Sequence, residues 1–271
     1  MTNDRLTRRD LLKRSLTFGS GAALLVIGLK AAKGALPAPD TAATADGKSP
    51  SGVQLPDGYD PHQHYYGYAI DIDKCIGCTR CVDACKTENK VSRTEPNFRT
   101  WVERYTIRND GEVEVASPNG GLDPYPPVEN PDTVAKSFYV PKMCSHCERS
   151  PCEQVCPVGA SLHTPDGVVL IDKAYCIGCS YCIQACPYGC RYFDESTRTA
   201  GKCTLCYHRI TRGLRPACVE VCPTGARVFG DLRDKDGPLV KFIREHKVQV
   251  LKPHMGTRPK LFYHHLDKDV H

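Results

Sequence analysis

Long apolar runs are scarce in this chain of 271 residues. The N-terminal run, from residue 16 to residue 29, has about 14 residues, whereas a membrane-spanning helix needs roughly 20. The composition is 41% hydrophobic and 25% charged, and the mean hydropathy is −0.39. These values exclude a polytopic membrane protein and a disordered chain. A chain of this length can bury one large core or two small ones.

Several catalytic and cofactor-binding signatures are also missing. No C-x-x-C pair is followed by His, which excludes attachment of a c-type haem. We find no nucleophile paired with a base and no glycine-rich phosphate loop, since Gly120 and Gly121 lie in a proline-rich loop, residues 119–131. The chain on its own is therefore not expected to be an enzyme.

An excess of one charge is absent once the N-terminus is set aside. The net charge of +5 invites a nucleic-acid interpretation, but residues 1–34 contain seven basic and two acidic residues. The rest of the chain has 29 of each. Because the basic excess lies in one terminal segment, no nucleic-acid partner is expected.

That terminal segment is predicted to be an export signal. Adjacent Arg8 and Arg9 precede the apolar run, a pattern typical of a twin-arginine signal over residues 1–34, and predict a periplasmic location. Cleavage near residue 34 or near residue 45 and retention as an uncleaved anchor all remain open. Residues 35–64, rich in Pro, Ala, Gly, Ser and Asp, are predicted to be a linker. The twin-arginine route serves proteins that fold and load cofactors before export, which suggests a metal centre.

The abundant residue is cysteine: there are 17, and 16 of them form four tetrads. In chain order, the tetrads are Cys75, Cys78, Cys81 and Cys85; Cys144, Cys147, Cys152 and Cys156; Cys176, Cys179, Cys182 and Cys186; and Cys203, Cys206, Cys218 and Cys222. The first and third have the bacterial ferredoxin spacing C-x2-C-x2-C-x3-C, while the second and fourth have gaps of x4 and x11. Each tetrad predicts one [4Fe–4S] cluster, four in all.

Other uses of these cysteines fit less well. Three cysteines within seven residues cannot all form independent disulfides, and zinc suits only the fourth tetrad with its long gap. Cys190 is predicted to be a small buried thiol. His146 and His208 are expected to hydrogen-bond cluster sulfide or to lie on the surface, because every tetrad already has four thiols.

The chain contains an internal repeat, since residues 72–78 are echoed by 171–179 and residues 152–160 by 218–226. We predict an α+β fold with two ferredoxin-like two-cluster modules over residues 65–262, and a tail from 263 to 271. Short helices are expected after the fourth cysteines, and an inserted β-rich segment is expected over residues 86–143. The predicted strands are residues 68–72, 98–107, 112–116, 168–171 and 248–251, and a helix is predicted over 238–246.

The four motifs in this order, with Cys-Pro-Tyr-Gly after the third tetrad and Cys-Pro-Thr-Gly-Ala after the fourth, resemble the iron-sulfur subunit of the dimethyl sulfoxide reductase family over residues 65–262. The resemblance implies crossed ligation, in which the fourth cysteine of each tetrad serves a different tetrad's cluster. Spacing alone equally allows the first tetrad to pair with the second. The implied groups are Cys75, Cys78 and Cys81 with Cys222; Cys203, Cys206 and Cys218 with Cys85; Cys144, Cys147 and Cys152 with Cys186; and Cys176, Cys179 and Cys182 with Cys156.

The resemblance also implies a function. The expected protein is a non-catalytic electron-transfer subunit in a hetero-oligomer, between a quinone-linked membrane anchor subunit and a molybdopterin catalytic subunit. A quinone-linked complex without molybdenum, a structural zinc scaffold and a self-sufficient reductase are the alternatives. Cluster potentials span about −700 to +450 mV, so the sequence does not give the direction of electron flow.

Overall fold

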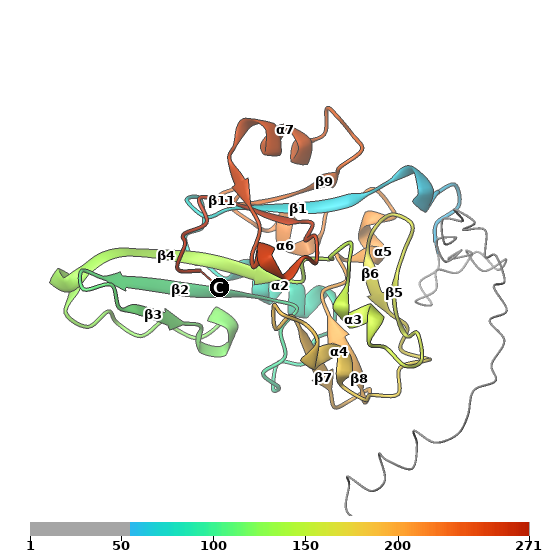
Figure 1. Ribbon diagram of the computed structural model, residues 1–271, viewed down its shortest axis with the longest axis horizontal. Coiled ribbons are helices and arrows are strands. Elements are labelled where there is room, and N and C mark those ends of the chain that lie inside the picture. The colour runs from blue at the N-terminus through green and yellow to red at the C-terminus, as the bar shows by residue number, and fades with distance from the viewer. Residues whose placement is uncertain (1–54, 271) are drawn as a thin grey trace, which may run out of the picture. The chain divides into compact units, whose positions relative to one another are not determined.

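The structure is a computed structural model that describes residues 55–270; the predicted signal lies outside the described residues, as does the linker up to residue 54 (Figure 1). Within the described part, the helices are short and most of them carry cysteines. They are α2 (Arg80–Glu88), α3 (Pro151–Gln154), α4 (Tyr181–Gln184), α5 (Tyr207–Ile210), α6 (Ala217–Glu220) and α7 (Pro238–Glu245). Four 3-10 turns, η1 (Pro61–Gln63), η2 (Pro118–Gly121), η3 (Pro131–Thr133) and η4 (Pro253–Met255), lie in the connections.

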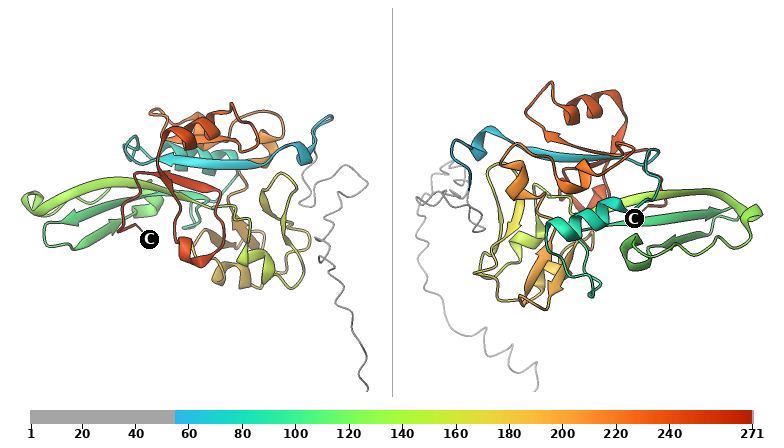
Figure 2. Two further views of the ribbon diagram at one scale, coloured as in Figure 1. Left: turned by 45° about the horizontal axis from the view of Figure 1, so that its top comes forward. Right: turned by 180° about the vertical axis from the view of Figure 1, so that it is seen from behind.

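One sheet joins the two ends of the folded chain. Its strand order is β10-β11-β1-β9, from β1 (Tyr66–Asp71), β9 (Arg227–Asp231), β10 (Val248–Gln249) and β11 (Leu261–His264). β1 pairs antiparallel with β9 and parallel with β11. All six residues of β1 are buried. The helix α7 lies over one face of the sheet (Figure 2) and packs against Ala69, whereas Tyr68 and Ile70 belong to the main core.

A second sheet follows the first tetrad. It has the order β3-β2-β4, from β2 (Thr100–Arg108), β3 (Val113–Ala116) and β4 (Val134–Met143), and reaches away from the cysteine-bearing helices (Figure 1). β2 and β3 lie where strands were predicted, whereas β4 was not predicted. The last residue of β4 directly precedes Cys144, so this sheet leads into the second tetrad.

Two small hairpins accompany the middle tetrads. The first pairs β5 (Ser161–His163) with β6 (Val169–Ile171), and the second pairs β7 (Arg191–Asp194) with β8 (Thr199–Lys202). β5 and β7 each begin five residues after the fourth cysteine of a tetrad. Together with the short helices and the four-stranded sheet, these hairpins make up the mixed α and β structure of two ferredoxin-type dicluster domains.

The prediction that short helices follow the fourth cysteines is wrong. α3, α4 and α6 each contain the third cysteine of a tetrad and end two residues before the fourth. Proline follows Cys156, Cys186 and Cys222, and a residue before proline is disfavoured in a helix. Lys86 follows Cys85 instead, and there α2 continues to Glu88.

The predicted domain boundaries are too narrow at both ends. The hydroxyl of Tyr59 donates to the Asp166 carboxylate over 2.6 Å, and the His64 ring stacks between those of Tyr59 and Tyr66. At the other end, Tyr263 and Val270 are buried. The end of the predicted linker and most of the predicted tail therefore pack onto the domain. Among the described residues, no helix combines the length and the apolar character that a bilayer crossing needs.

Candidate iron–sulfur sites

Sixteen cysteines gather in four separate cavities, four to a cavity. Site A is lined by Cys75, Cys78, Cys81 and Cys222; site B by Cys85, Cys203, Cys206 and Cys218; site C by Cys144, Cys147, Cys152 and Cys186; and site D by Cys156, Cys176, Cys179 and Cys182. The four cavities are similar in size. The grouping in space is the crossed one, with the first tetrad beside the fourth and the second beside the third.

The backbone turns in the same way in all four C-x-x-C loops. The residue before the second cysteine has positive φ in each: 68° at Gly77, 42° at His146, 72° at Gly178 and 52° at Leu205. Glycine adopts this conformation at little cost, so its presence in the first and third tetrads is explained. The equivalent His146 and Leu205 are buried and are held in this conformation by the surrounding packing.

Helical turns join the sites in pairs. Cys81 at site A and Cys85 at site B are four residues apart on α2, and Cys152 at site C is four residues before Cys156 at site D. Four residues span about 6 Å along a helix, so the sites of each pair are neighbours. We call sites A and B the outer half and sites C and D the inner half.

The two halves meet between sites B and C. Met143 lines site B, and the next residue, Cys144, lines site C. Lys202 is buried between them, where its positive charge opposes the increase that burial causes in the pKa values of Cys152 and Cys203. The sites therefore follow the order A, B, C, D.

The most exposed cysteines lie at the ends of this series, although Cys144 and Cys186 at site C are half-buried. Cys78 at site A and Cys179 at site D are the only exposed cysteines, while all four at site B are buried. The isoleucines that follow Cys75 at site A and Cys176 at site D are also exposed, with exposed fractions of 60% for Ile76 and 63% for Ile177. Exposed isoleucines beside both end sites suit contact with other proteins.

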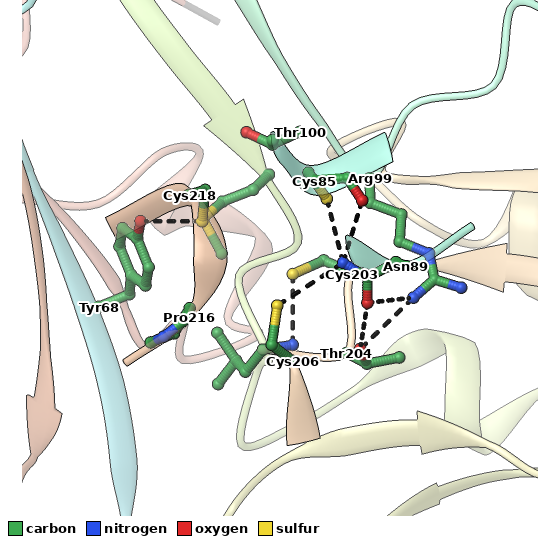
Figure 3. A pocket seen from close by; sticks show the side chains of 12 residues that line it. Tyr68, Cys85, Asn89, Arg99, Thr100, Cys203, Thr204, Cys206, Pro216 and Cys218 are labelled. Carbon is green, nitrogen blue, oxygen red and sulfur yellow. Dashed lines mark hydrogen bonds between the residues drawn. The ribbon is translucent and has the colours of Figure 1, made fainter. Parts of the chain in front are cut away.

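Hydrogen-bond donors surround the thiols at site B (Figure 3). The side-chain amide of Asn89 lies 3.6 Å from both Cys85 Sγ and Cys206 Sγ, and the Arg99 guanidinium holds that amide through its oxygen at 3.0 Å. On the opposite wall, the hydroxyl of Tyr68 lies 3.4 Å from Cys218 Sγ. Such donors stabilise negative charge on sulfur.

The donor set fits [4Fe–4S] clusters. Each cavity presents four thiols from the tetrads, the full ligand set of one cubane. Burial raises the pKa of Cys75 to about 11 and of Cys147 and Cys203 to about 12, so these thiols are protonated at neutral pH until a metal displaces the proton. Among the described residues, no three or more His, Cys, Asp or Glu side chains are arranged around a single metal ion.

Cys190 is a fifth sulfur beside site C, buried as predicted. Its thiol lies 3.1 Å from the Met143 carbonyl oxygen and 3.3 Å from that of Tyr188. A hydrogen bond from Cys190 lowers the pKa of Cys186 to about 5, whereas the same contact and burial raise that of Cys190. Cys186 is therefore the readier thiolate of the two.

Neither histidine near a tetrad lines a cysteine cavity. His146 is buried, its Nδ1 accepts from the Val169 N–H over 3.0 Å, and burial holds its pKa well below the usual range. His208 lies on the partly exposed side of α5, with its Nε2 2.6 Å from Glu88 Oε1. Neither side chain meets a cluster site, and His208 lies at the surface, one of the two places predicted for it.

Sequence reasoning missed the buried arginines around the sites. Arg191 lines sites C and D, and Arg227 lines site A. Each is the fifth residue after the fourth cysteine of a tetrad. The sequence signal was the shared spacing of five residues from Cys186 to Arg191 and from Cys222 to Arg227.

Comparison with known proteins agrees with the site. Two family models described as "4Fe-4S dicluster domain" match residues 74–160 and 135–232. The B subunit of tetrathionate reductase from Salmonella typhimurium is 39% identical over 76% of this chain and 74% of its own length. The B subunit of polysulfide reductase from Wolinella succinogenes is 37% identical over 73% of this chain and 92% of its own length. A putative dimethyl sulfoxide reductase iron-sulfur subunit of Halobacterium salinarum is 40% identical over 73% of this chain and 78% of its own length.

These relatives are iron-sulfur subunits of reductases and not the catalytic subunits. The part of this chain that resembles them is the part that matches the dicluster domains. The chain therefore belongs to the dimethyl sulfoxide reductase family of iron-sulfur subunits, and it transfers electrons through [4Fe–4S] clusters without catalysing a reaction of its own.

Proposed function

We propose that this chain is a periplasmic subunit that carries four [4Fe–4S] clusters, at sites A to D, and relays electrons between a quinone-linked membrane anchor subunit and a molybdopterin catalytic subunit. The observation that carries the proposal is the set of four similar cavities, each lined by four cysteines in the crossed grouping. A [4Fe–4S] cluster with four thiolate ligands supplies one-electron transfer and has no open position for substrate.

The residues of this chain suit such a relay. Electrons enter and leave at sites A and D, because these sites have the exposed Cys78 and Cys179. Site B, whose four cysteines are all buried, keeps the electron away from water within the series. Around site D, Tyr175 and Tyr181 join Ile177 in exposing large apolar area, and this supports a protein partner at that end.

Metal analysis of the native complex tests the proposal. The complex would be purified through a tag on the C-terminus of this chain and assayed for iron, molybdenum and quinol oxidation. We expect about 16 iron atoms per chain and stoichiometric molybdenum. A colourless subunit that contains zinc would refute cluster binding.

An intact, quinol-active complex without molybdenum would instead support the second candidate, a quinone-linked redox complex without a molybdopterin partner. The crossed cysteine geometry serves both functions equally well. The molybdenum assay therefore separates them, because it reports on the partner alone.

Export is tested separately. The proposal predicts that changing Arg8 and Arg9 together to lysine retains the subunit in the cytoplasm, because the twin-arginine pathway reads the arginine pair. Fractionation followed by detection of the C-terminal tag gives the readout. A double variant that still reaches the periplasm would contradict export by this route.

A further inference from the structure

Arg191 and Arg227 occupy equivalent places after the fourth cysteines of the third and fourth tetrads. Each follows a fourth cysteine by five residues, and each is the first residue of a strand, β7 or β9. Both are buried, with exposed fractions of 5% and 3%. Each also donates to a hydroxyl on the first residue of another strand, Arg191 to Ser161 over 2.7 Å and Arg227 to Thr100 over 2.9 Å.

Arg191 contacts both sites of the inner half. Its Nη2 donates to Cys152 Sγ of site C over 2.9 Å, and it also interacts with Cys182 of site D. Its Nε and Nη1 are buried and have no hydrogen-bond partner among the described residues. The side chain lines both cavities, so these unused donors are next to the spaces where the cluster sulfides would lie.

Arg227 occupies the matching position in the outer half. It lines site A and interacts with Cys81 of site A and Cys218 of site B. Its Nη1 lies 3.4 Å from the hydroxyl of Tyr68, which in turn lies 3.4 Å from Cys218 Sγ. The guanidinium thus reaches the second site of its half through one tyrosine.

The charge of these arginines has no protein counterion. Within residues 55–270, no carboxylate pairs with Arg191 or Arg227, although Arg108, Arg209 and Arg258 are ion-paired. A buried charge without a partner is strongly unfavourable. A cluster with four thiolates is anionic, and one-electron reduction makes it more negative, so the clusters supply the missing counterions.

We propose that Arg191 and Arg227 set the reduction potentials of the clusters, each through a fixed positive charge shared by the two sites of its own half. This inference rests on the proposed four-cluster function. Each arginine favours the reduced state of both neighbouring clusters, because reduction adds negative charge beside it. Each arginine therefore raises the reduction potentials of both clusters in its own half. The potentials of the other half depend on the other arginine.

Potentiometric titration of the cluster-loaded full-length chain, followed by electron paramagnetic resonance, tests this. Arg191→Met is expected to lower the reduction equilibrium constants of two clusters at least tenfold, which is about 59 mV for a one-electron couple. Arg227→Met is expected to do the same to the other two. The double variant is expected to shift all four.

Two further variants separate charge from structure. Arg258→Met removes an arginine near site C that is exposed and paired with Glu148, and it should leave all four potentials unchanged because solvent screens that charge. Arg191→Lys keeps the charge but not the planar fork that reaches both sites, so its shift should be smaller than that of Arg191→Met.

The outcomes are distinct. Potentials that stay unchanged in both methionine variants, or the same pair of clusters shifting in both, would overturn the inference. So would loss of iron from both variants, because a charge that only sets potentials is not needed for assembly. A wild-type chain with fewer than four clusters would contradict the proposed function itself.

Discussion

The carboxylate of Glu88, at the end of α2, lies 2.6 Å from Nε2 of His208 on α5. A carboxylate has no proton to give at neutral pH, so the imidazole donates. The same carboxylate also pairs with Arg209 at 3.0 Å. This contact ties the first tetrad to the fourth beside site B, because Glu88 is three residues from Cys85 and His208 two from Cys206.

Glu88→Gln is expected to destabilise the outer half by about 1 kcal/mol at pH 7, a typical value for a partly buried ion pair. The hydrogen bond from His208 lowers the pKa of Glu88 below its ordinary value of 4.5. A depressed carboxyl pKa stabilises the fold above the unfolded pKa, and that stability is lost as the pH falls through the folded-state pKa.

The rate at which the absorbance near 400 nm bleaches in mild guanidinium measures this difference. We expect the variant to bleach several-fold faster than wild type at pH 7, and the ratio to fall toward one as the pH drops below 4.5 and through the lowered pKa of Glu88. Glu112→Gln serves as the control, because Glu112 is largely exposed and 4.0 Å from Arg108. A ratio that does not depend on pH would exclude this role for Glu88.

Because of the crossed grouping, substituting either of two cysteines that are far apart in the sequence should remove the same cluster. Cys85 belongs to the first tetrad in sequence but lines site B with Cys203. Cys85→Ala and Cys203→Ala should therefore each leave about 12 iron atoms per chain, and the double variant should also leave about 12.

The comparison pair is Cys75→Ala with Cys85→Ala. These cysteines share a tetrad but line different sites, so the double variant should retain about 8 iron atoms. If each tetrad bound its own cluster, the two iron counts would be reversed. Iron analysis of the purified full-length chain distinguishes the two arrangements.

Cys190→Ala tests which sulfur serves site C. Alanine occupies the equivalent position after two other tetrads, as Ala160 and Ala226, so the loop accommodates a methyl group. The variant should keep about 16 iron atoms and lose about 1 kcal/mol of stability from the small cavity. Cys186→Ala should lose one cluster, and the opposite result would make Cys190 the ligand.

The sequence predicted the local features of this chain better than its long-range ones. The spacing of the tetrads predicts [4Fe–4S] clusters, because in the first three tetrads three cysteines lie within nine residues of one another. β1 was predicted because residues 68–72 form a short β-prone run just before a cluster loop, and α7 lies where a helix was predicted over 238–246. Arg191 and Arg227 were missed, since a buried arginine looks like a surface arginine until the fold shows that no carboxylate is near. The crossing of the tetrads was predicted from the family resemblance, because spacing alone did not distinguish it from pairing between neighbours.

The prediction of helices after the fourth cysteines was wrong for a local reason that was visible in the sequence. Proline follows Cys156, Cys186 and Cys222, so a helix before these cysteines has to end ahead of them and cannot begin there. The predicted domain boundaries at residues 65 and 262 were too narrow, because Tyr59 and Tyr263 form hydrogen bonds with residues far away in the sequence.

Gly178 provides the sharpest steric test of a cluster loop. Its φ is +72°, and a Cβ atom added there would lie 2.5 Å from the carbonyl oxygen of Arg198, which is backbone and cannot move aside easily. Gly189 has a similar φ of +62°, but a Cβ atom there meets nothing within 4 Å. The two glycines therefore share the conformational cost of a substitution and differ in the clash.

Gly178→Ala should displace the loop that carries Cys176 and Cys179, so the chain is expected to retain about 12 iron atoms. Gly189→Ala should cost about 1 kcal/mol for the left-handed conformation and keep about 16. Iron content and the thermal midpoint of each loaded variant give the comparison. Equal iron in both would mean that the Arg198 carbonyl does not constrain the loop of site D, since only the clash separates the two substitutions.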